Sequence, residues 1–240
     1  MKIKILYEDK DVIAIEKPSG ISVHPSAYKG ETKGKKEKFI TDWVLENYPK
    51  MKNVGEPSGD IVRPGIVHRL DKETSGVLLL AKNQKFYEFL KQQFQDKKIR
   101  KVYIAIVSGF IKNDTGIIDK PIGRSPTDFR KRLAGRGAKG IVREAVTEFK
   151  VIKRFEDKKG NKFSILEIYP KTGRTHQIRV HMKYFSHPVV CDKLYAPNDP
   201  YPLNLDRLGL HAKSIEFKNL KGDKIKVESL IPKEFKNFGK

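Results

Sequence analysis

Cysteine is almost absent from this sequence, in which Cys191 is the single example among 240 residues. One cysteine excludes an intramolecular disulfide and any zinc site built from several thiolates. Long apolar runs are also missing, because no stretch approaches the roughly 18 residues that a membrane-spanning helix needs. The first residues, MKIKILYEDKDV, carry charges where a signal peptide would have its apolar core. We therefore expect a soluble cytoplasmic protein with no membrane partner.

Acidic residues are too few to balance the basic ones, since 29 Asp and Glu face 50 Lys and Arg, a formal net charge of +21. This excess is larger than solubility requires and indicates a polyanionic partner, most simply nucleic acid. A lysine-coated surface of the kind found in heat-adapted proteins is the alternative. No internal repeat or break in composition divides the chain, so we predict a single domain over residues 1–240.

The N-terminal half has clear periodic patterns. Two short β-rich runs at 3–7 and 12–16 predict a hairpin, and the continuous apolar run 77–81 predicts a buried strand. Asn83 is expected to N-cap a helix in which Phe86 and Leu90 share the buried face. The following KVYIAIVSG alternates, which predicts a strand with Tyr103, Ala105 and Val107 on one face.

The C-terminal half is less regular. Residues 162–169 predict a strand, and LHAKSIEF and IKVESL predict a closing pair of strands. Thr41 and Thr175 are expected to N-cap two short helices. Residues 124–143, which we call the basic segment, are rich in Arg and Lys and show no sustained period. We predict that they form a flexible loop that faces phosphates, with a solvated loop lacking a partner as the alternative.

Familiar cofactor and metal motifs are missing. The sequence has no glycine-rich phosphate loop and no GxGxxG, so neither a nucleotide nor a dinucleotide site is indicated, and we expect no cofactor. His176, His181 and His187 are spaced by five and six residues, whereas two metal ligands on a helix are usually four apart. We therefore predict no metal site, and a metal-dependent phosphodiesterase is disfavoured.

Asp71 lies in VHRLDKETSG, immediately before the apolar run VLLLAK. A loop aspartate usually forms a turn or a salt bridge. Here the buried strand that follows provides a rigid base for the loop. Nearby Arg69 and Lys72 would keep the carboxylate ionised, which favours a nucleophile or an electrostatic partner over a general acid. The basic segment and KTGRTHQIR could converge on the same cleft.

The sequence HRLDKETSGVLLLAK resembles the signature motif of the RluA-type pseudouridine synthases. Four further blocks resemble this family in the same order, between residue 6 and about residue 217: LYEDKDVIAIEKPSGISVHP, KVYIAIVSG, KTGRTHQIRVHM, and HPVVCDKLYA with LGLHAKSIEF. The resemblance implies an α+β fold with a central, mainly antiparallel mixed sheet flanked by helices and loops. It also implies an RNA-modifying isomerase that needs no cofactor.

The resemblance implies three catalytic residues. Asp71 corresponds to the aspartate that attacks the target uridine. Tyr103 corresponds to a tyrosine that stacks on the flipped-out base and can act as a general base. Arg179 corresponds to the basic residue that pairs with the aspartate and keeps it ionised. Without the motif, Tyr103 would be an ordinary half-buried strand aromatic and Arg179 a surface arginine.

The expected partner is structured RNA, ribosomal or transfer, bound by a monomer without an obligate protein partner. Arg69 is our candidate to fill the space that the flipped base leaves. The other candidate RNA contacts are His68, Arg130, Arg132, Arg136, Lys139, Arg174 and His176. A non-catalytic RNA-binding or RNA-folding module with the same fold is the alternative function.

Some features depart from the family pattern. Many members have a separate small RNA-binding domain before the catalytic one, and this chain starts directly at the catalytic hairpin, so we expect no such domain here. The closing block usually has glycines where Cys191 and Ala196 stand. We therefore expect that the backbone there could differ from the family geometry.

Overall fold

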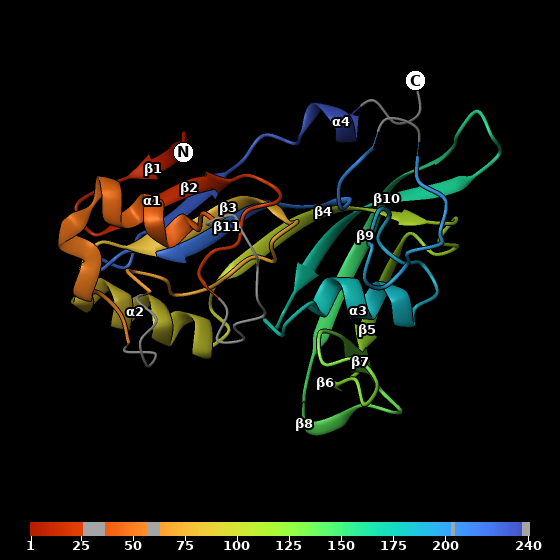
Figure 1. Cartoon of the computed structure of the whole chain (residues 1–240), viewed down its shortest axis with the longest axis horizontal. Helices are drawn as coiled ribbons and strands as arrows, with labels where there is room; N and C mark the ends of the chain where they lie inside the picture. Colours follow the sequence, from red (N-terminus) through yellow and green to blue (C-terminus); the bar gives the residue numbers. More distant parts are fainter. Residues whose placement is uncertain (26–36, 57–62, 203–204, 237–240) are drawn as a thin grey trace. The chain divides into compact units, whose positions relative to one another are not determined.

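The computed structural model describes residues 1–25, 37–56, 63–202 and 205–236, and Figure 1 shows the chain with its helices and strands labelled. The chain divides into two compact units, each with its own buried side chains. The first unit contains Met1–Ile99 and Ser214–Ser229, and the second contains Arg100–Lys213 and Leu230–Lys240. Within the described part, no helix is both long enough and apolar enough to cross a membrane. The mixed α+β class and the mainly antiparallel strand pairing are as predicted.

The first unit is built on an antiparallel hairpin that continues into a third strand. Its strands are β1 (Lys4–Glu8), β2 (Val12–Lys17), β3 (Ser75–Ala81), the Ser214–Lys218 part of β11 (Leu210–Lys218), and β12 (Lys224–Glu228). Strand β2 pairs with β1 and β3, and β11 pairs with β12, all antiparallel. The predicted hairpins at 3–16 and at the end of the chain are thus confirmed. Both form because a short polar turn separates two β-rich runs.

Among the described residues of the first unit are three short helical elements: α1 (Ile40–Asn47), the 3₁₀ helix η1 (Pro49–Asn53) and α2 (Gln84–Gln95). The prediction for α2 is confirmed, because the Asn83 Oδ1 atom accepts a hydrogen bond from the Phe86 N–H at 2.9 Å. Phe86 and Leu90 are buried in one cluster with β2 and β3. Thr41 is not an N-cap as predicted, since α1 begins at Ile40 and its N-cap is Phe39, two residues earlier. There the Asp42 carboxylate accepts the N–H of Phe39 at 2.9 Å.

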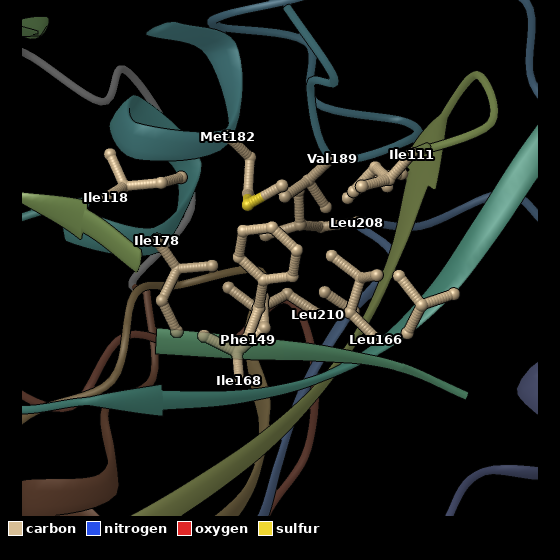
Figure 2. Close-up of a cluster of buried hydrophobic side chains, with 13 residues drawn as sticks. Ile111, Ile118, Phe149, Leu166, Ile168, Ile178, Met182, Val189, Leu208 and Leu210 are labelled. Atoms are coloured by element: carbon tan, nitrogen blue, oxygen red, sulfur yellow. The ribbon is translucent and has the colours of Figure 1, made fainter. Parts of the chain in front are cut away.

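The second unit contains a four-stranded antiparallel sheet in the order β4-β10-β9-β5. These strands are β4 (Arg100–Ser108), β5 (Thr115–Asp119), β9 (Val146–Glu156) and β10 (Lys162–Pro170), and the unit also contains α3 (Gln177–Tyr184) and α4 (Lys233–Lys236). Figure 2 shows Phe149 of β9 surrounded by apolar side chains, among them Ile178 and Met182 of α3. This cluster holds α3 on the sheet.

The alternation predicted for β4 is confirmed. Ala105 and Val107 lie in the cluster of Figure 2, with Tyr103 packed against it, whereas Ile104 and Ile106 belong to a different cluster. Successive strand residues face opposite sides, so both faces of β4 are covered by apolar side chains. Tyr103 is therefore held on a strand that packs on both sides.

The basic segment is not the irregular loop that the sequence predicted. It contributes to a three-stranded antiparallel sheet, ordered β7-β6-β8, made of β6 (Ile122–Arg124), β7 (Arg132–Ala134) and β8 (Lys139–Arg143). These strands have only three to five residues and are interrupted by Gly135, Gly137 and Gly140 at positive φ. No alternation of period two can be detected over runs this short.

The start of α3 also differs from the prediction by one residue. The N-cap is His176, in the left-handed region at φ 57°, and the preceding Thr175 is exposed. The departure at Cys191 has a structural counterpart, since this residue has φ 57°. Glycine adopts that conformation without strain. Cys191 therefore has a backbone conformation that favours glycine, at a position where the resemblance implies a glycine.

Candidate active site

The loop that carries Asp71 is held by a buried lysine. Lys17, at the end of β2, is 0% exposed. Its Nζ atom donates to the carbonyl oxygens of Pro18 and Ile21, each at 2.8 Å, and of Lys72 at 2.9 Å. An ammonium group has three N–H donors, which matches the number of these carbonyl acceptors. Lys17 thereby connects two loops that are 55 residues apart in sequence.

The loop after β2 makes further bonds to the same segment. The N–H of Gly20 donates to the Lys72 carbonyl at 2.9 Å, and the Ser19 hydroxyl donates to the Glu73 carbonyl at 2.7 Å. The Thr74 N–H closes a turn on the Asp71 carbonyl at 3.1 Å. The backbone around Asp71 is thus fixed by several hydrogen bonds, while the Asp71 side chain stays partly exposed.

The rest of the Asp71 motif connects this loop to β3. Thr74 and Ser75 are buried, and Gly76 has φ 113°, a conformation that side-chain-bearing residues rarely adopt. From there β3 is buried along its whole length. A loop that is fixed by hydrogen bonds and mounted on a buried strand can hold a reactive side chain in a defined position.

The two cations next to Asp71 contact other groups. Lys72 pairs with Glu37 at 2.8 Å, and the Arg69 Nη1 atom lies 3.3 Å from His24 Nε2. The other ring nitrogen of His24, Nδ1, lies 2.7 Å from the Pro25 carbonyl, to which it donates. Burial lowers the pKa of His24, which leaves Nε2 able to accept from Arg69. The Arg69 side chain is thereby held by one neutral imidazole at the surface of the first unit.

His68, a predicted RNA contact, has structural contacts inside the first unit. Its Nε2 atom accepts the N–H of Leu79 at 2.9 Å, and its ring stacks on Phe94 with centroids 5.0 Å apart. These contacts attach the chain before Asp71 to β3 and α2. An RNA contact by His68 stays a prediction.

On β4 of the second unit, Tyr103 is partly buried, and Lys101 lies two residues before it. The Lys101 Nζ atom donates to the Thr172 carbonyl at 3.1 Å. Burial, reinforced by the charge of Arg174, lowers the pKa of Lys101 to about 8. Sequence reasoning did not single out Lys101, although its position two residues from Tyr103 places both on one face of the strand.

The KTGRTHQIR motif is organised by the buried side chain of Gln177. Its Oε1 atom accepts from the Thr172 hydroxyl at 2.7 Å and from the Arg174 N–H at 3.0 Å. Its Nε2 group donates to the Val146 carbonyl and the Thr147 hydroxyl, both at 3.0 Å. The loop before α3 is thus fixed on β9. Arg174 also donates from Nε to the Glu144 carbonyl at 2.9 Å, next to the end of the basic segment.

Arg179 forms a buried bidentate pair with Asp192. The Nε–Oδ2 distance is 2.7 Å and the Nη2–Oδ1 distance is 2.8 Å, and the two residues are 8% and 1% exposed. The guanidinium also lies 5.1 Å from the ring centre of Tyr195. The sequence prediction gave Arg179 a different partner, Asp71. Because these residues belong to different units, that pairing stays a prediction, while Asp192 is a partner that sequence reasoning missed.

The basic segment carries four of the predicted RNA contacts. Arg130 forms a bidentate pair with Asp128, which lowers the pKa of that carboxyl to about 2. The Arg132 guanidinium donates to two backbone carbonyls of the preceding turn at 3.0 and 3.1 Å. Arg136 and Lys139 have exposed side chains. The small sheet therefore brings Arg130, Arg136 and Lys139 to the surface, and Arg132 has a mainly structural role.

The three histidines considered as metal ligands contact other groups. His176 Nδ1 lies 2.8 Å from the Tyr195 hydroxyl, and His187 Nδ1 lies 2.8 Å from the Ser108 carbonyl. Both ring nitrogens of buried His181 lie 2.9 Å from an oxygen, and burial lowers its pKa. Over the residues that the structure describes, no group of three or more His, Cys, Asp or Glu could hold a metal ion.

Comparison with known proteins gives one consistent result. Residues 11–184 match the family model described as RNA pseudouridylate synthase. An uncharacterized RNA pseudouridine synthase from Bacillus subtilis is 37% identical over 98% of this chain and 71% of its own length. A protein named ribosomal large subunit pseudouridine synthase D from Borreliella burgdorferi is 39% identical over 98% of this chain and 67% of its own length. For an uncharacterized relative from Aquifex aeolicus, 44% identical, the match covers 80% of this chain and only 56% of that protein.

Solved structures agree on the fold. Human RNA pseudouridylate synthase domain containing 4 matches with a TM-score of 0.70 and 26% identity, covering 97% of this chain and 90% of that one. Human RNA pseudouridylate synthase domain containing 1 matches with a TM-score of 0.75 at 22% identity, covering 96% and 84%. At that identity the second likeness concerns the fold alone.

Proposed function

Because this chain belongs to the RNA pseudouridylate synthase family, we propose that it converts specific uridines of structured RNA to pseudouridine with Asp71 as the nucleophile. The observation that carries this proposal is the loop geometry of the first unit. The partly exposed carboxylate of Asp71 lies on a backbone that Lys17, Ser19 and Gly20 hold through hydrogen bonds to the carbonyls of the next two residues. A structural turn aspartate would not need a buried ammonium group behind it.

The reaction is an isomerisation, and its atoms balance without a co-reactant. The bond between N1 of uracil and C1′ of ribose breaks while the base is held in the site. The base then rotates and a bond forms between C5 and C1′. The proton on C5 is lost to solvent, and N1 gains one. Asp71 is proposed to supply the nucleophile that carries the reacting fragment between these two bonds.

Tyr103 and Arg179 are proposed to complete the site. Tyr103 projects from a strand packed on both faces, so its ring can stack on a base with little loss of side-chain freedom. Arg179 would stabilise the ionised form of Asp71. Flipping a base out of its stack costs a few kcal/mol. Arg69, held at the surface by His24, is proposed to occupy the vacated space and offset part of this cost.

Large-subunit ribosomal RNA is the first substrate to test, with transfer RNA as the second. Two kinds of observation support this order. The net charge of +21 suits a phosphate-rich partner. Relatives from Borreliella burgdorferi and Pseudomonas aeruginosa, 39% and 33% identical, are named ribosomal large subunit pseudouridine synthase D.

The decisive measurement is tritium release from RNA labelled at C5 of uridine, on separate ribosomal and transfer RNA fractions. The wild-type protein should release tritium from at least one fraction, and Asp71→Asn should release none above background. Asp96→Asn, at the end of α2, is the matched control and should behave as wild type. Absence of release from every fraction by the wild type would overturn the enzymatic proposal in favour of a non-catalytic RNA-binding module.

A further inference from the structure

The basic segment is packed against α3 through a small apolar cluster. Strand β7 contacts this helix, and Figure 1 shows the small sheet of β6, β7 and β8 below it in this view. The cluster joins the small sheet to α3 and to the chain after it, and its buried members are Ile122, Ala134, Ala145, Val180 and Tyr195. A second contact lies near the end of α3. There, a Cβ atom placed on Gly135 would be 3.3 Å from the Tyr184 ring. The basic segment therefore has a defined position on the helix that carries Arg179.

One hydroxyl group connects this segment to the start of α3. The N–H of Arg132 in β7 donates to the Tyr195 hydroxyl at 2.9 Å, and the same oxygen lies 2.8 Å from His176 Nδ1. Tyr195 is 8% exposed. Burying a hydroxyl is unfavourable unless hydrogen bonds compensate, and a phenylalanine would fill the same apolar volume. The hydroxyl thus contributes its two bonds, to β7 and to His176, rather than packing.

The ring of the same tyrosine contacts the arginine. The Arg179 guanidinium lies 5.1 Å from the Tyr195 ring centre, within the range of a cation–π interaction. The Tyr195 N–H donates to Asp192 Oδ1 at 3.1 Å, and Asp192 in turn accepts two hydrogen bonds from Arg179. Tyr195 therefore contacts the basic segment with its hydroxyl and Arg179 with its ring.

We propose that Tyr195 is a positioning residue, which fixes the basic segment relative to Arg179. RNA bound by the basic segment is thereby placed with its target uridine at the catalytic residues. This inference rests on the proposed function. It assigns to the Tyr195 hydroxyl a role in RNA recognition and to the Tyr195 ring a role in orienting Arg179. The two roles can be separated by substitution.

The first experiment separates the hydroxyl from the ring by steady-state kinetics on the most active RNA fraction. Tyr195→Phe should raise KM about fivefold, the factor that one neutral hydrogen bond contributes to an equilibrium, and should change kcat less than about twofold. Tyr195→Leu should lower kcat as well, because it removes the ring from Arg179. The control Tyr201→Phe, at a tyrosine that is 38% exposed, should match wild type. A loss confined to kcat in Tyr195→Phe would overturn the proposal.

The second experiment asks whether Tyr195 acts through the basic segment. The double variant Arg130→Ala/Arg136→Ala removes two exposed cations of that segment and should itself raise KM. In this background Tyr195→Phe should raise KM by less than about twofold, because effects that pass through the same contact are not additive. If Tyr195→Phe still raised KM fivefold in this background, Tyr195 would not act through the basic segment and the proposal would be wrong. An unchanged KM for Arg130→Ala/Arg136→Ala would overturn the role of the segment.

The third experiment needs no catalysis, so it distinguishes failure of this inference from failure of the proposed function. Amide hydrogen exchange in the peptide containing Arg132 should be faster in Tyr195→Phe than in wild type. The dissociation constant of a ribosomal RNA fragment, measured by filter binding, should rise in parallel. Unchanged exchange or unchanged affinity overturns the inference even if the enzyme isomerises uridine. Both changes in a protein that releases no tritium would support the inference and reject only the catalytic proposal.

Discussion

Replacing Lys17 by methionine should loosen the Asp71 loop while the protein stays folded. Methionine has a similar length and no charge, so it can occupy the same buried space. The substitution removes three hydrogen bonds of 2.8 to 2.9 Å to the backbone carbonyls of Pro18, Ile21 and Lys72. The Lys72 carbonyl retains the N–H of Gly20 as a donor at 2.9 Å. The carbonyls of Pro18 and Ile21 lose the ammonium donor.

The expected cost follows from those two carbonyls. A fully buried acceptor that loses its donor costs about 1–3 kcal/mol, so two cost at most about 2–6 kcal/mol, and Pro18 and Ile21 are only partly buried. Relief from burying an ammonium charge offsets part of this, since the desolvation of such an ion costs several kcal/mol. We therefore expect a loss of about 3 kcal/mol, below the 5–15 kcal/mol that typical domains possess. For a chain of this size this corresponds to a decrease in Tm of about 6–12 °C.

The assay compares Lys17→Met with Lys4→Met, which removes a lysine whose side chain is 61% exposed. Lys4→Met should lower the free energy of unfolding by less than about 0.5 kcal/mol. Lys17→Met should lower kcat for pseudouridine formation more than about tenfold at a temperature where both variants are folded. Amide exchange at Gly20 and Thr74 should be faster as well. If Lys17→Met kept wild-type Tm and kcat, the three hydrogen bonds would not be what holds the Asp71 loop.

Three further results are expected. Burial lowers the pKa of Lys101 to about 8, so between pH 8 and about 10.5 the unfolded chain binds more protons and stability should rise with pH. Urea unfolding of Lys101→Met should show a smaller rise over that window. Burial also lowers the pKa of His24, so its contribution to stability should be complete above about pH 6.5 and decline below it. His24→Gln should flatten this acid decline in urea titrations between pH 5 and 7. Asn83→Ala removes the N-cap of α2 and should cost about 1 kcal/mol in thermal unfolding, whereas Asn83→Asp should retain most of it.

The elements that could be predicted from the sequence are those whose periodicity extends over several residues. The run 77–81 and the alternation around Tyr103 were sufficient because each pattern extends over several residues: β3 is buried along its whole length, and alternate residues of β4 belong to two different clusters. The N-cap Asn83 was recognisable because its partner is only three residues away. The strands of the basic segment were missed because each is too short to show a pattern. The two threonines predicted as N-caps do not have this role. The actual N-caps are Phe39, two residues before Thr41, and His176, one residue after Thr175.

Residues that hold the site were harder to find than those proposed to react. The pattern of β2 gave no sign that Lys17 is buried, because lysine is almost always exposed and its acceptor Lys72 is 55 residues away. Asp192 is one carboxylate in the block HPVVCDKLYA, and nothing local indicates that it pairs with Arg179. Such long-range pairs depend on how the elements pack. They cannot be deduced from propensity or spacing.

Three of the bonds around the candidate site share a feature that explains part of this difficulty. Lys17, Ser19 and Lys101 each donate from a side chain to a backbone carbonyl of a remote loop. A carbonyl is present at every residue, so these bonds place no demand on the side chain at the accepting position. The donor of each pair must therefore be a particular kind of side chain. The acceptor can be any residue whose carbonyl oxygen lies within hydrogen-bond distance of that donor. The sequence contains the donors without marking them, and the three-dimensional fold is needed to show which loops they hold.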